Sequence, residues 1–364
     1  MIWLTDYRTA CTDQTQALED LPYPQRVHMF PETYRRSETG LVYPPHKLAD
    51  KVLDPQLVAD VRSRPGKTGF ILASGNSHFA GMNGKEKKTQ LWYDYKMLPM
   101  TLTQVYAGRI AQQMGAQDLV TTDASACASS LKVMMDVYIM INFYGFKRVV
   151  VLSLEDAVSN NVLQFFGESG ACLTLKQEEE SKVIPSAFDS NNFGFYVAQG
   201  AVLAVFESAD SGHARLVSAY SASESSTNAI GQRDDGEGFV KAMHGAMKYG
   251  NVSPGNISVV KTHGTGTRSN NLAEARAIKS VLNDFVATSL KPTIGHTMGA
   301  SGLLETCVLL DRLKQTGKVP AIKNRTEHDP VFLSEDTRPR SGMIMSLAAG
   351  MGNIYSAAIF DPRV

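Results

Sequence analysis

The chain has 364 residues, 43% hydrophobic and 20% charged, a composition typical of a globular protein with one large core or two fused ones. Lysine and arginine number 36, as do aspartate and glutamate, so no net charge attracts nucleic acid or an anionic membrane. The N-terminus lacks the pattern of a signal peptide, and no segment approaches the about 18 apolar residues of a membrane span, so we predict a soluble, cytoplasmic protein.

Residues 20–66 are rich in proline, tyrosine and arginine without a sustained hydrophobic period, which predicts an ordered but irregular surface segment. The chain then alternates between strand-like and helix-like patterns, which indicates a mixed α/β fold in one compact unit of two similar lobes. In the first half we expect strands at 69–74 and 148–154, a helix at 100–115, and a hairpin of 170–175 with 200–208. In the second half we expect strands at 214–223, 256–264, 342–349 and 353–360, and helices at 236–250, 272–285 and 301–317.

The four cysteines, Cys11, Cys127, Cys172 and Cys307, form no CxxC pair, which argues against a zinc ribbon or a disulfide framework. Cys172 and Cys307 lie in apolar patterns typical of small buried hydrophobes. Cys127 lies among small residues just before 131–143, a stretch that is apolar on nearly every side and therefore predicts a helix buried all round. Free N–H groups and the helix dipole at such a start should lower the pKa of the thiol by about one unit or more, which suits attack on a thioester. A buried structural cysteine is the alternative that this segment leaves open.

Two histidine-containing turns follow. VVKTHGTGT presents His263 at a strand end, where sites in α/β proteins commonly form, and KPTIGHTMGASG places His296 between glycines before a helix. Either histidine alone is more often structural. Together with Cys127 they can hold a thioester and stabilise the enolate formed when a malonyl unit loses carbon dioxide, as neutral imidazoles donating through Nε2. The histidines lack metal-type spacing and no Walker lysine pattern occurs, so we predict no metal or nucleotide site.

These segments resemble the β-ketoacyl synthases of the thiolase superfamily, in order from about residue 70 to the C-terminus. ASACASSL resembles the segment with the family nucleophile, THGTGT and KPTIGHTMGASG the two histidine motifs, and MSLAAGMGN the glycine-rich loop. The resemblance implies an α/β, thiolase-like, five-layered αβαβα fold from two pseudo-symmetric halves, 1–208 with the nucleophile and 209–364 with the histidines. It also implies an acyltransferase that performs decarboxylative condensation of an acyl thioester with malonyl-acyl carrier protein, in fatty-acid or specialised polyketide or polyene biosynthesis.

The same resemblance implies catalytic roles for five residues. Cys127 would accept the acyl group, and His263 and His296 would assist decarboxylation and stabilise the carbanion. Lys291 would support the second histidine, and Glu274 would organise the region around the first. For these two charged residues, solvated positions at helix or loop edges are the alternative.

Substrate contacts are implied in the same way. Thr265 and Thr267 match positions that hydrogen-bond the phosphopantetheine arm, although both could be plain turn residues. The backbone N–H groups of Cys127 and Leu347 would form the oxyanion hole, and Leu347 would occupy the substrate-binding position where the family often has a phenylalanine gate. The chain is also shorter than is usual in the family, mainly ahead of residue 90, so chain-length control and partner docking are expected to differ.

No cofactor is implied beyond the carrier's phosphopantetheine arm. We expect an acyl carrier protein as partner, and a homodimer or a heterodimer with a chain-length-factor-like subunit. Lys85, Lys87 and Lys88, or Arg35 and Arg36, could meet an acidic carrier, although such residues are more often solvated surface charges. Two alternatives stay open: a thioester-dependent acyltransferase that does not condense, and a ketosynthase subunit active only with its partner. A non-catalytic partner subunit would normally lack the cysteine.

Overall fold

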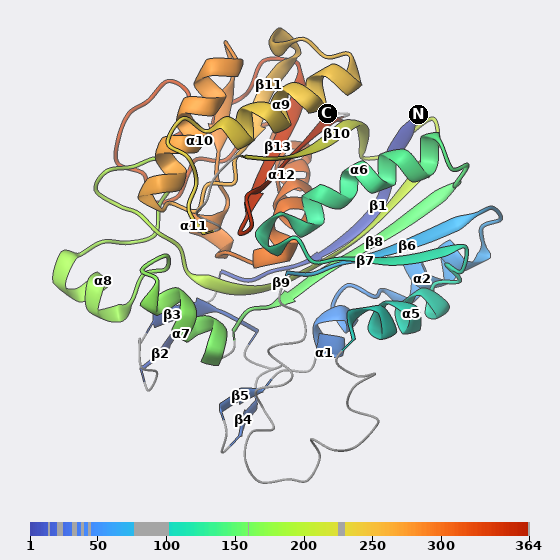
Figure 1. The fold of residues 1–364 in the computed structure, drawn as a ribbon, viewed down its shortest axis with the longest axis horizontal. Coiled ribbons are helices and arrows are strands. Elements are labelled where there is room, and N and C mark those ends of the chain that lie inside the picture. The colour runs from blue at the N-terminus through green and yellow to red at the C-terminus, as the bar shows by residue number, and fades with distance from the viewer. Residues whose placement is uncertain are drawn as a thin grey trace.

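The structure is a computed structural model, shown in Figure 1, that describes residues 1–13, 15–19, 25–30, 35–37, 40–42, 45–75, 102–158, 160–224 and 230–362. Lys85, Lys87 and Lys88 lie outside these residues, as do the side chains of Arg35 and Arg36. The carrier contacts suggested for these basic residues therefore stay predictions.

In the described part of the chain, one 12-stranded sheet runs in the order β12-β11-β13-β14-β10-β1-β9-β8-β6-β7. Along this path the same arrangement occurs twice, three parallel strands followed by two antiparallel ones. The first set is β7 (Leu119–Asp123), β6 (Thr68–Ala73), β8 (Arg148–Asp156), β9 (Val197–Ser208) and β1 (Ile2–Ala10). The second set is β12 (Val286–Thr288), β11 (Ile257–Lys261), β13 (Met343–Gly350), β14 (Ile354–Pro362) and β10 (Ala214–Ser223). Since β1 pairs with both β9 and β10, it joins two pseudo-symmetric halves.

Helices lie between the halves and on both outer faces (Figure 1). The middle layer is α6 (Ser129–Asn142) with α12 (Ser301–Thr316), and its core includes side chains from the strands of both halves. One outer layer is α1 (Pro45–Asp50), α2 (Pro55–Ser63) and α5 (Thr103–Gln113), and the other is α9 (Glu237–Gly250) with α10 (Arg268–Val281). The predicted five-layered αβαβα fold is therefore confirmed.

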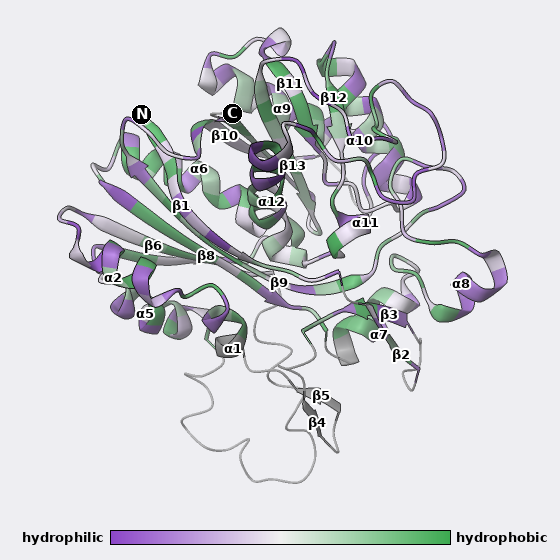
Figure 2. Cartoon of the chain, turned by 180° about the vertical axis from the view of Figure 1, so that it is seen from behind, coloured by the Kyte–Doolittle hydropathy of each residue, from purple (hydrophilic) through white to green (hydrophobic). Residues whose placement is uncertain are grey.

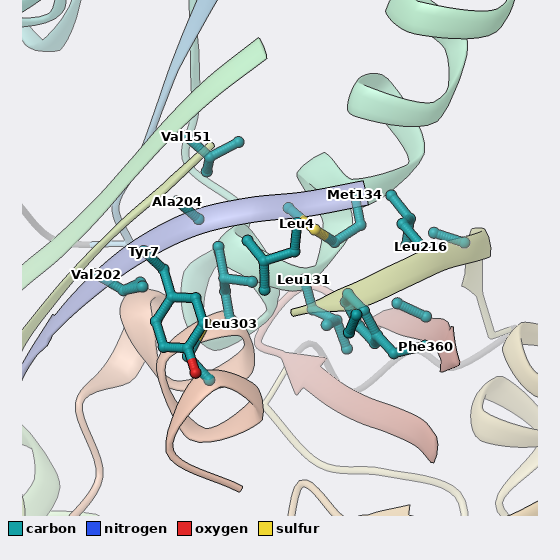
Figure 3. Packing of buried hydrophobic residues seen from close by; sticks show 14 of the residues in the cluster. Leu4, Tyr7, Leu131, Met134, Val151, Val202, Ala204, Leu216, Leu303 and Phe360 are labelled. Carbon is teal, nitrogen blue, oxygen red and sulfur yellow. The ribbon is translucent and has the colours of Figure 1, made fainter. Parts of the chain in front are cut away.

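The middle layer is apolar because it contacts a sheet face on each side. Figure 3 shows Leu131 and Met134 of α6 and Leu303 of α12 packed among side chains of the surrounding strands, Val151 and Phe360 included. Each such side chain contributes about 1.5–3 kcal/mol when fully buried. Figure 2 shows the same trend along the chain, with hydrophobic residues concentrated on the central strands and hydrophilic ones on peripheral helices such as α8 (Leu175–Ser181).

Short elements complete the description. Besides α8, the chain forms α7 (Asn160–Glu168), α11 (Lys291–Ile294) and the 3-10 turns η3 (Ala126–Ala128), η4 (Pro254–Asn256) and η5 (Met298–Ala300). β2 (Thr15–Leu18) pairs with β3 (Gln25–His28), and β3 pairs with β9, while β4 (Arg35–Ser37) and β5 (Gly40–Val42) pair with each other.

One face of α6 departs from prediction. The helix was expected to be buried all round, but Lys132, Met135, Asp136 and Ile139 are only half-buried, and their spacing places them on one stripe. Lys132 pairs there with Asp123 at the end of β7. The expectation of complete burial is wrong for this stripe because β7 is the last strand of the sheet, and nothing described covers the helix beyond it.

The predicted hairpin is wrong as well. Residues 170–174 form no strand and lead into α8, because Thr174 and Gln177 form a reciprocal capping box that starts a helix. The other predicted partner is β9, which pairs with β8 and β1 instead.

Residues 20–66, predicted to be irregular, contain a regular helix. Asp54 accepts the N–H groups of Gln56 and Leu57 and so starts α2.

No helix among the described residues is long and apolar enough to cross a membrane. β9 ends at Ser208 and β10 begins at Ala214, so the predicted division at 208/209 falls in their connection. That division stays a prediction.

Candidate active site

Cys127 lies in η3, between the end of β7 and the start of α6. Ala126 adopts a left-handed φ of 48°, which turns the chain sharply before the cysteine. Space around this turn is tight, since a Cβ at Gly75 would lie 2.9 Å from the Ala126 carbonyl oxygen and one at Gly350 would lie 2.5 Å from that of Ser125. Packing against the Cys127 turn therefore requires glycine at both of these neighbouring positions.

The second half repeats this turn. η5 precedes α12 as η3 precedes α6, and Met298 has a φ of 42° at the position equivalent to Ala126. The two turns contact each other, and the Met298 Sδ lies 3.9 Å from the Cys127 Sγ. Cys127 in the turn of the first half thus faces the corresponding turn of the second half, which follows His296 by two residues.

Both predicted histidines reach the cysteine. A small pocket of about 110 Å³ is lined by Cys127, His263, His296, Thr265 and Thr267 among others. The two imidazole rings lie edge to face with centroids 5.8 Å apart. The segment that carries Cys127 lies more than a hundred residues before those that carry the two histidines. All three nevertheless meet in one cavity, as the sequence predicts.

His296 is held by β9 of the first half. Its backbone N–H donates to the Tyr196 carbonyl at 2.7 Å, and its carbonyl accepts from the Ala198 N–H at 3.0 Å. The Phe195 ring contacts the imidazole edge to face, with centroids 4.9 Å apart. The ring is fixed by backbone pairing and aromatic packing, and the site crosses the junction between halves.

His263 is held by charged groups. Glu274 accepts the backbone N–H of His263 at 2.6 Å and that of Gly264 at 2.9 Å, and the Asn270 side-chain amide donates to the same carboxylate. Lys291 Nζ donates to the His263 carbonyl at 2.5 Å. Glu274 and Lys291 are almost fully buried, which excludes the solvated positions considered from sequence. Lys291 anchors the first histidine motif, whereas the sequence predicted support of the second.

Two further charged residues escaped the sequence analysis. Glu305 on α12 accepts from Lys291 at 2.8 Å, and from Lys261, the last residue of β11, at 3.2 Å. Lys261 also donates to the Leu347 carbonyl at 3.0 Å. The sequence did contain a signal for this pair, because Lys261 ends the apolar run ISVVK and Glu305 interrupts the apolar run GLLETCVLL. A charged residue in such a run is expected to be buried and must then find a buried partner.

The histidines are neutral. Burial, followed by the positive charge of Lys291, lowers the pKa of both His263 and His296 well below its usual value. The Nδ1 atom of each is buried without a hydrogen-bond partner among the described residues. Because orphaned N–H donors are rarer than orphaned acceptors, this favours the tautomer with its proton on Nε2. Both rings can then donate through Nε2.

The predicted lowering of the Cys127 pKa is wrong. Burial raises the pKa of this thiol to about 12, and the positive charge of Lys291 opposes the effect only in part. The start of a helix favours a thiolate, but a side chain only 8% exposed and surrounded by apolar groups favours the neutral thiol more strongly. The Cys127 thiol is therefore protonated at neutral pH.

The structure also corrects the position of Leu347. Its side chain is completely buried in the outer core beside α9 and α10, and it does not line the pocket. The strand reaches the cavity two residues later, where Ala349, Gly350 and Met351 form part of the wall. The substrate-facing position and the second oxyanion donor predicted at Leu347 are therefore better sought at 349–351, next to η3.

The two threonines lie at the same pocket. Thr265 and Thr267 are within hydrogen-bond distance of each other, with their Oγ1 atoms 3.0 Å apart, and both line the cavity. Thr267 precedes α10 without capping it, so its hydroxyl is not committed to the helix. Their predicted contact with a phosphopantetheine arm fits this position but is not tested by it.

Solved structures with similar folds include two ketosynthase complexes. A type II polyketide synthase acyl carrier protein in complex with its ketosynthase, AntDE:AntF, matches with a TM-score of 0.82 and 17% identity, covering 100% of this chain and 99% of that one. The ketosynthase ApeO in complex with its chain length factor ApeC, from Xenorhabdus doucetiae, matches with a TM-score of 0.76 and 16% identity over 100% and 98% of the chains. At this identity the likeness establishes the fold.

Sequence relatives agree with the motifs. The chain is 27% identical to the tetracenomycin polyketide synthase ketoacyl synthase alpha subunit of Streptomyces glaucescens, over 69% of this chain and 62% of that protein. It is 25% identical to 3-oxoacyl-[acyl-carrier-protein] synthase 2 of Synechocystis sp., over 64% of this chain and 58% of that protein. The chain spans about three fifths of the length of the curated relatives it matches.

Two family models match successive parts of the chain. The beta-ketoacyl synthase N-terminal domain matches residues 46–211, and the beta-ketoacyl synthase C-terminal domain matches residues 213–325. Since the two models together match well over half of the sequence, the chain belongs to the β-ketoacyl synthase family.

Proposed function

We propose that the protein catalyses decarboxylative condensation between an acyl group held on Cys127 and malonyl-acyl carrier protein. The observation that carries the proposal is the meeting of Cys127, His263 and His296 in one pocket, with the two imidazole rings 5.8 Å apart. A cysteine with one histidine suffices for acyl transfer. The second neutral histidine adds what condensation needs, a further donor for an enolate oxygen.

Acyl loading begins from a neutral thiol. As the Cys127 sulfur bonds to the thioester carbonyl carbon, its proton passes to Nε2 of a neutral imidazole that has shifted its own proton to Nδ1, which is available because both histidines are held neutral. The developing oxyanion lies beside the Cys127 N–H and the 349–351 wall. The carbon–sulfur bond to the carrier arm then breaks, and the departing thiolate takes the proton back. The products are acyl-Cys127 and the free carrier thiol.

Condensation uses both histidines as donors. The malonyl carboxylate leaves as carbon dioxide, and the electron pair of the broken carbon–carbon bond moves into an enolate whose oxygen accepts N–H from His263 and His296. The enolate carbon attacks the acyl-Cys127 carbonyl, the carbon–sulfur bond breaks, and Cys127 leaves as a thiolate that takes up a proton from water. Burial, which disfavours the thiolate at rest, here favours its rapid reprotonation.

Partners follow from the same proposal. Malonyl and acyl units would arrive on the phosphopantetheine arm of a carrier, with Thr265 and Thr267 contacting the arm, and no other cofactor is required. A second subunit, identical or chain-length-factor-like, would pair at β7, the last strand of the sheet, beside the half-buried stripe of α6. The solved relatives with a carrier protein and with a chain length factor support both kinds of partner. We also retain a cytoplasmic location and a role in fatty-acid or polyketide biosynthesis as proposals.

The test is intact-protein mass spectrometry of the full chain, offered acyl-carrier thioesters and then malonyl-carrier, with product capture on the carrier. The proposal expects an acyl adduct on Cys127 followed by a β-ketoacyl carrier. An adduct without carbon–carbon bond formation, alone and with a co-expressed chain-length-factor-like subunit, would instead indicate acyl transfer. No adduct on Cys127 would contradict the nucleophile assignment itself.

A further inference from the structure

We propose that Lys261 is a positioning residue for condensation: its buried ammonium group ties the end of β11, two residues before His263, to the strand that forms the pocket wall at 349–351, and supplies positive charge to the histidine pair. The inference rests on the proposed function of the same pocket. It concerns a residue that lies outside the cavity and outside the catalytic set named from sequence.

Lys261 is fully buried, which is rare for a lysine. Its Nζ donates to Glu305 Oε2 at 3.2 Å and to the Leu347 carbonyl at 3.0 Å, and both partners are fully buried too. Burying an ammonium group costs several kcal/mol, and replacing a buried ion pair by apolar groups of similar size often leaves stability unchanged or improved. Stability alone therefore does not account for a lysine here, two residues before a catalytic histidine.

Glu305 divides its two oxygens between two lysines. Oε1 accepts from Lys291, which holds the His263 carbonyl, and Oε2 accepts from Lys261. Without the Lys261 ammonium, the Lys291–Glu305 pair and the anchor of His263 would persist. What would be lost is the side-chain bond to the Leu347 carbonyl, a contact that adds to the pairing of β13 with β14 just before Ala349 reaches the pocket.

The end of β13 matters because it contacts the Cys127 turn. A Cβ at Gly350 would lie 2.5 Å from the Ser125 carbonyl oxygen and 3.2 Å from the Ala128 nitrogen, so the backbone of β13 lies directly against η3. A small displacement of this strand changes the wall that faces the reacting carbonyl. Misplacements of about 1 Å can cost about 100-fold in rate.

The charge of Lys261 acts on the histidines as well. Three charged groups interact with Lys261: Glu305 on α12, Lys291 on α11 and Glu274 on α10. In addition to burial and Lys291, the positive charge of Lys261 contributes to lowering the pKa of both His263 and His296. Removing this charge raises both pKa values, so the histidines become protonated at a higher pH. The pH below which activity is lost therefore moves upward.

The experiment compares the full-length wild type with Lys261→Met and Lys261→Gln. For Lys261→Met we expect kcat of condensation to fall about 10-fold or more with KM for malonyl-carrier changed less than about 3-fold, and the acid limb of the pH profile to rise by about half a pH unit. Lys261→Gln retains a donor for the Leu347 carbonyl without the charge. It should keep more of kcat while showing the same shift of the acid limb, and it provides the test if Lys261→Met does not fold.

The matched control is Arg148→Met, which removes another buried cation, paired with Glu207 at 2.7 Å in the first half of the chain. Its kcat and acid limb should equal those of the wild type at a comparable loss of Tm. Unchanged kcat and acid limb in both Lys261 variants, or the same losses in Arg148→Met, would overturn the proposal. If the wild type itself does not condense, the proposed function fails, and NMR titration of His263 and His296 in the same variants still decides whether Lys261 sets their protonation.

Discussion

The imidazole rings of His263 and His296 lie edge to face with centroids 5.8 Å apart, and each belongs to a turn held by a different kind of contact. His263 is held through its backbone by Glu274 and Lys291, whereas His296 is held by pairing with β9. Because the first anchor is electrostatic and the second is a sheet contact from the other half, the two rings should respond differently to mutation and pH.

Cys127→Ala should abolish acyl loading, because no other described cysteine lines the pocket. The measurement is the mass of the protein after exposure to an acyl-carrier thioester. Cys307→Ala is the matched control: Cys307 is fully buried in the middle layer, so this change should cost stability but leave the adduct intact. Undiminished labelling of Cys127→Ala would refute the nucleophile assignment.

Alkylation of Cys127 should be slow at neutral pH and should accelerate about tenfold per pH unit between pH 7 and 9. The reason is that burial raises the pKa of the thiol to about 12, so the thiolate fraction grows with pH without reaching a plateau in this range. The rate constant for iodoacetamide, followed at Cys127 by peptide mass spectrometry, checks this. A plateau below pH 8 would mean that the helix start outweighs burial after all.

His263→Ala and His296→Ala should each reduce condensation about 100-fold or more, while acyl loading falls less than about 10-fold. Loading needs one proton acceptor, which the remaining histidine can provide, whereas the enolate needs both donors. Separate time courses of adduct formation and of β-ketoacyl product distinguish the two steps. The control is His244→Ala on the exposed side of α9, and normal condensation by both pocket variants would contradict the division of roles.

Gly350→Ala should slow acyl loading about 100-fold, because the new Cβ would lie 2.5 Å from the Ser125 carbonyl oxygen and displace η3 or the strand end. Gly108→Ala in α5 is the control, since nothing lies within 4 Å of a Cβ there and alanine favours the helix. Loading time courses on both variants measure the effect. Equal rates in the two would show that the contact between β13 and η3 does not position the nucleophile.

Local sequence patterns were sufficient to predict most helices and strands of the second half. The strand at 257–261, the helix at 301–316 and the two closing strands each bury a face or a run whose period can be read directly, so their existence was predicted. Where two patterns competed, the prediction failed. Residues 170–174 are apolar enough to predict a strand, but Thr174 and Gln177 form a capping box that starts a helix instead.

The same limit applies to residues whose partners are distant in sequence. Lys261 and Glu305 are 44 residues apart, and no local pattern states that their side chains meet. Leu347 was placed at the pocket from its motif, yet which residue of a strand reaches a cavity depends on where the strand ends against its neighbours, and that residue is Ala349.

By itself, the sequence identified the candidate reacting groups, since a cysteine among small residues and two histidines in glycine-rich turns are local features that chemistry can interpret. The tertiary structure decided their state. The thiol of Cys127 and both imidazoles are neutral because two sheets and a helical layer remove the pocket from water and place buried lysines beside it. Burial and charge in such a site are sums over residues far apart in the chain, so they exist only once the halves have packed together.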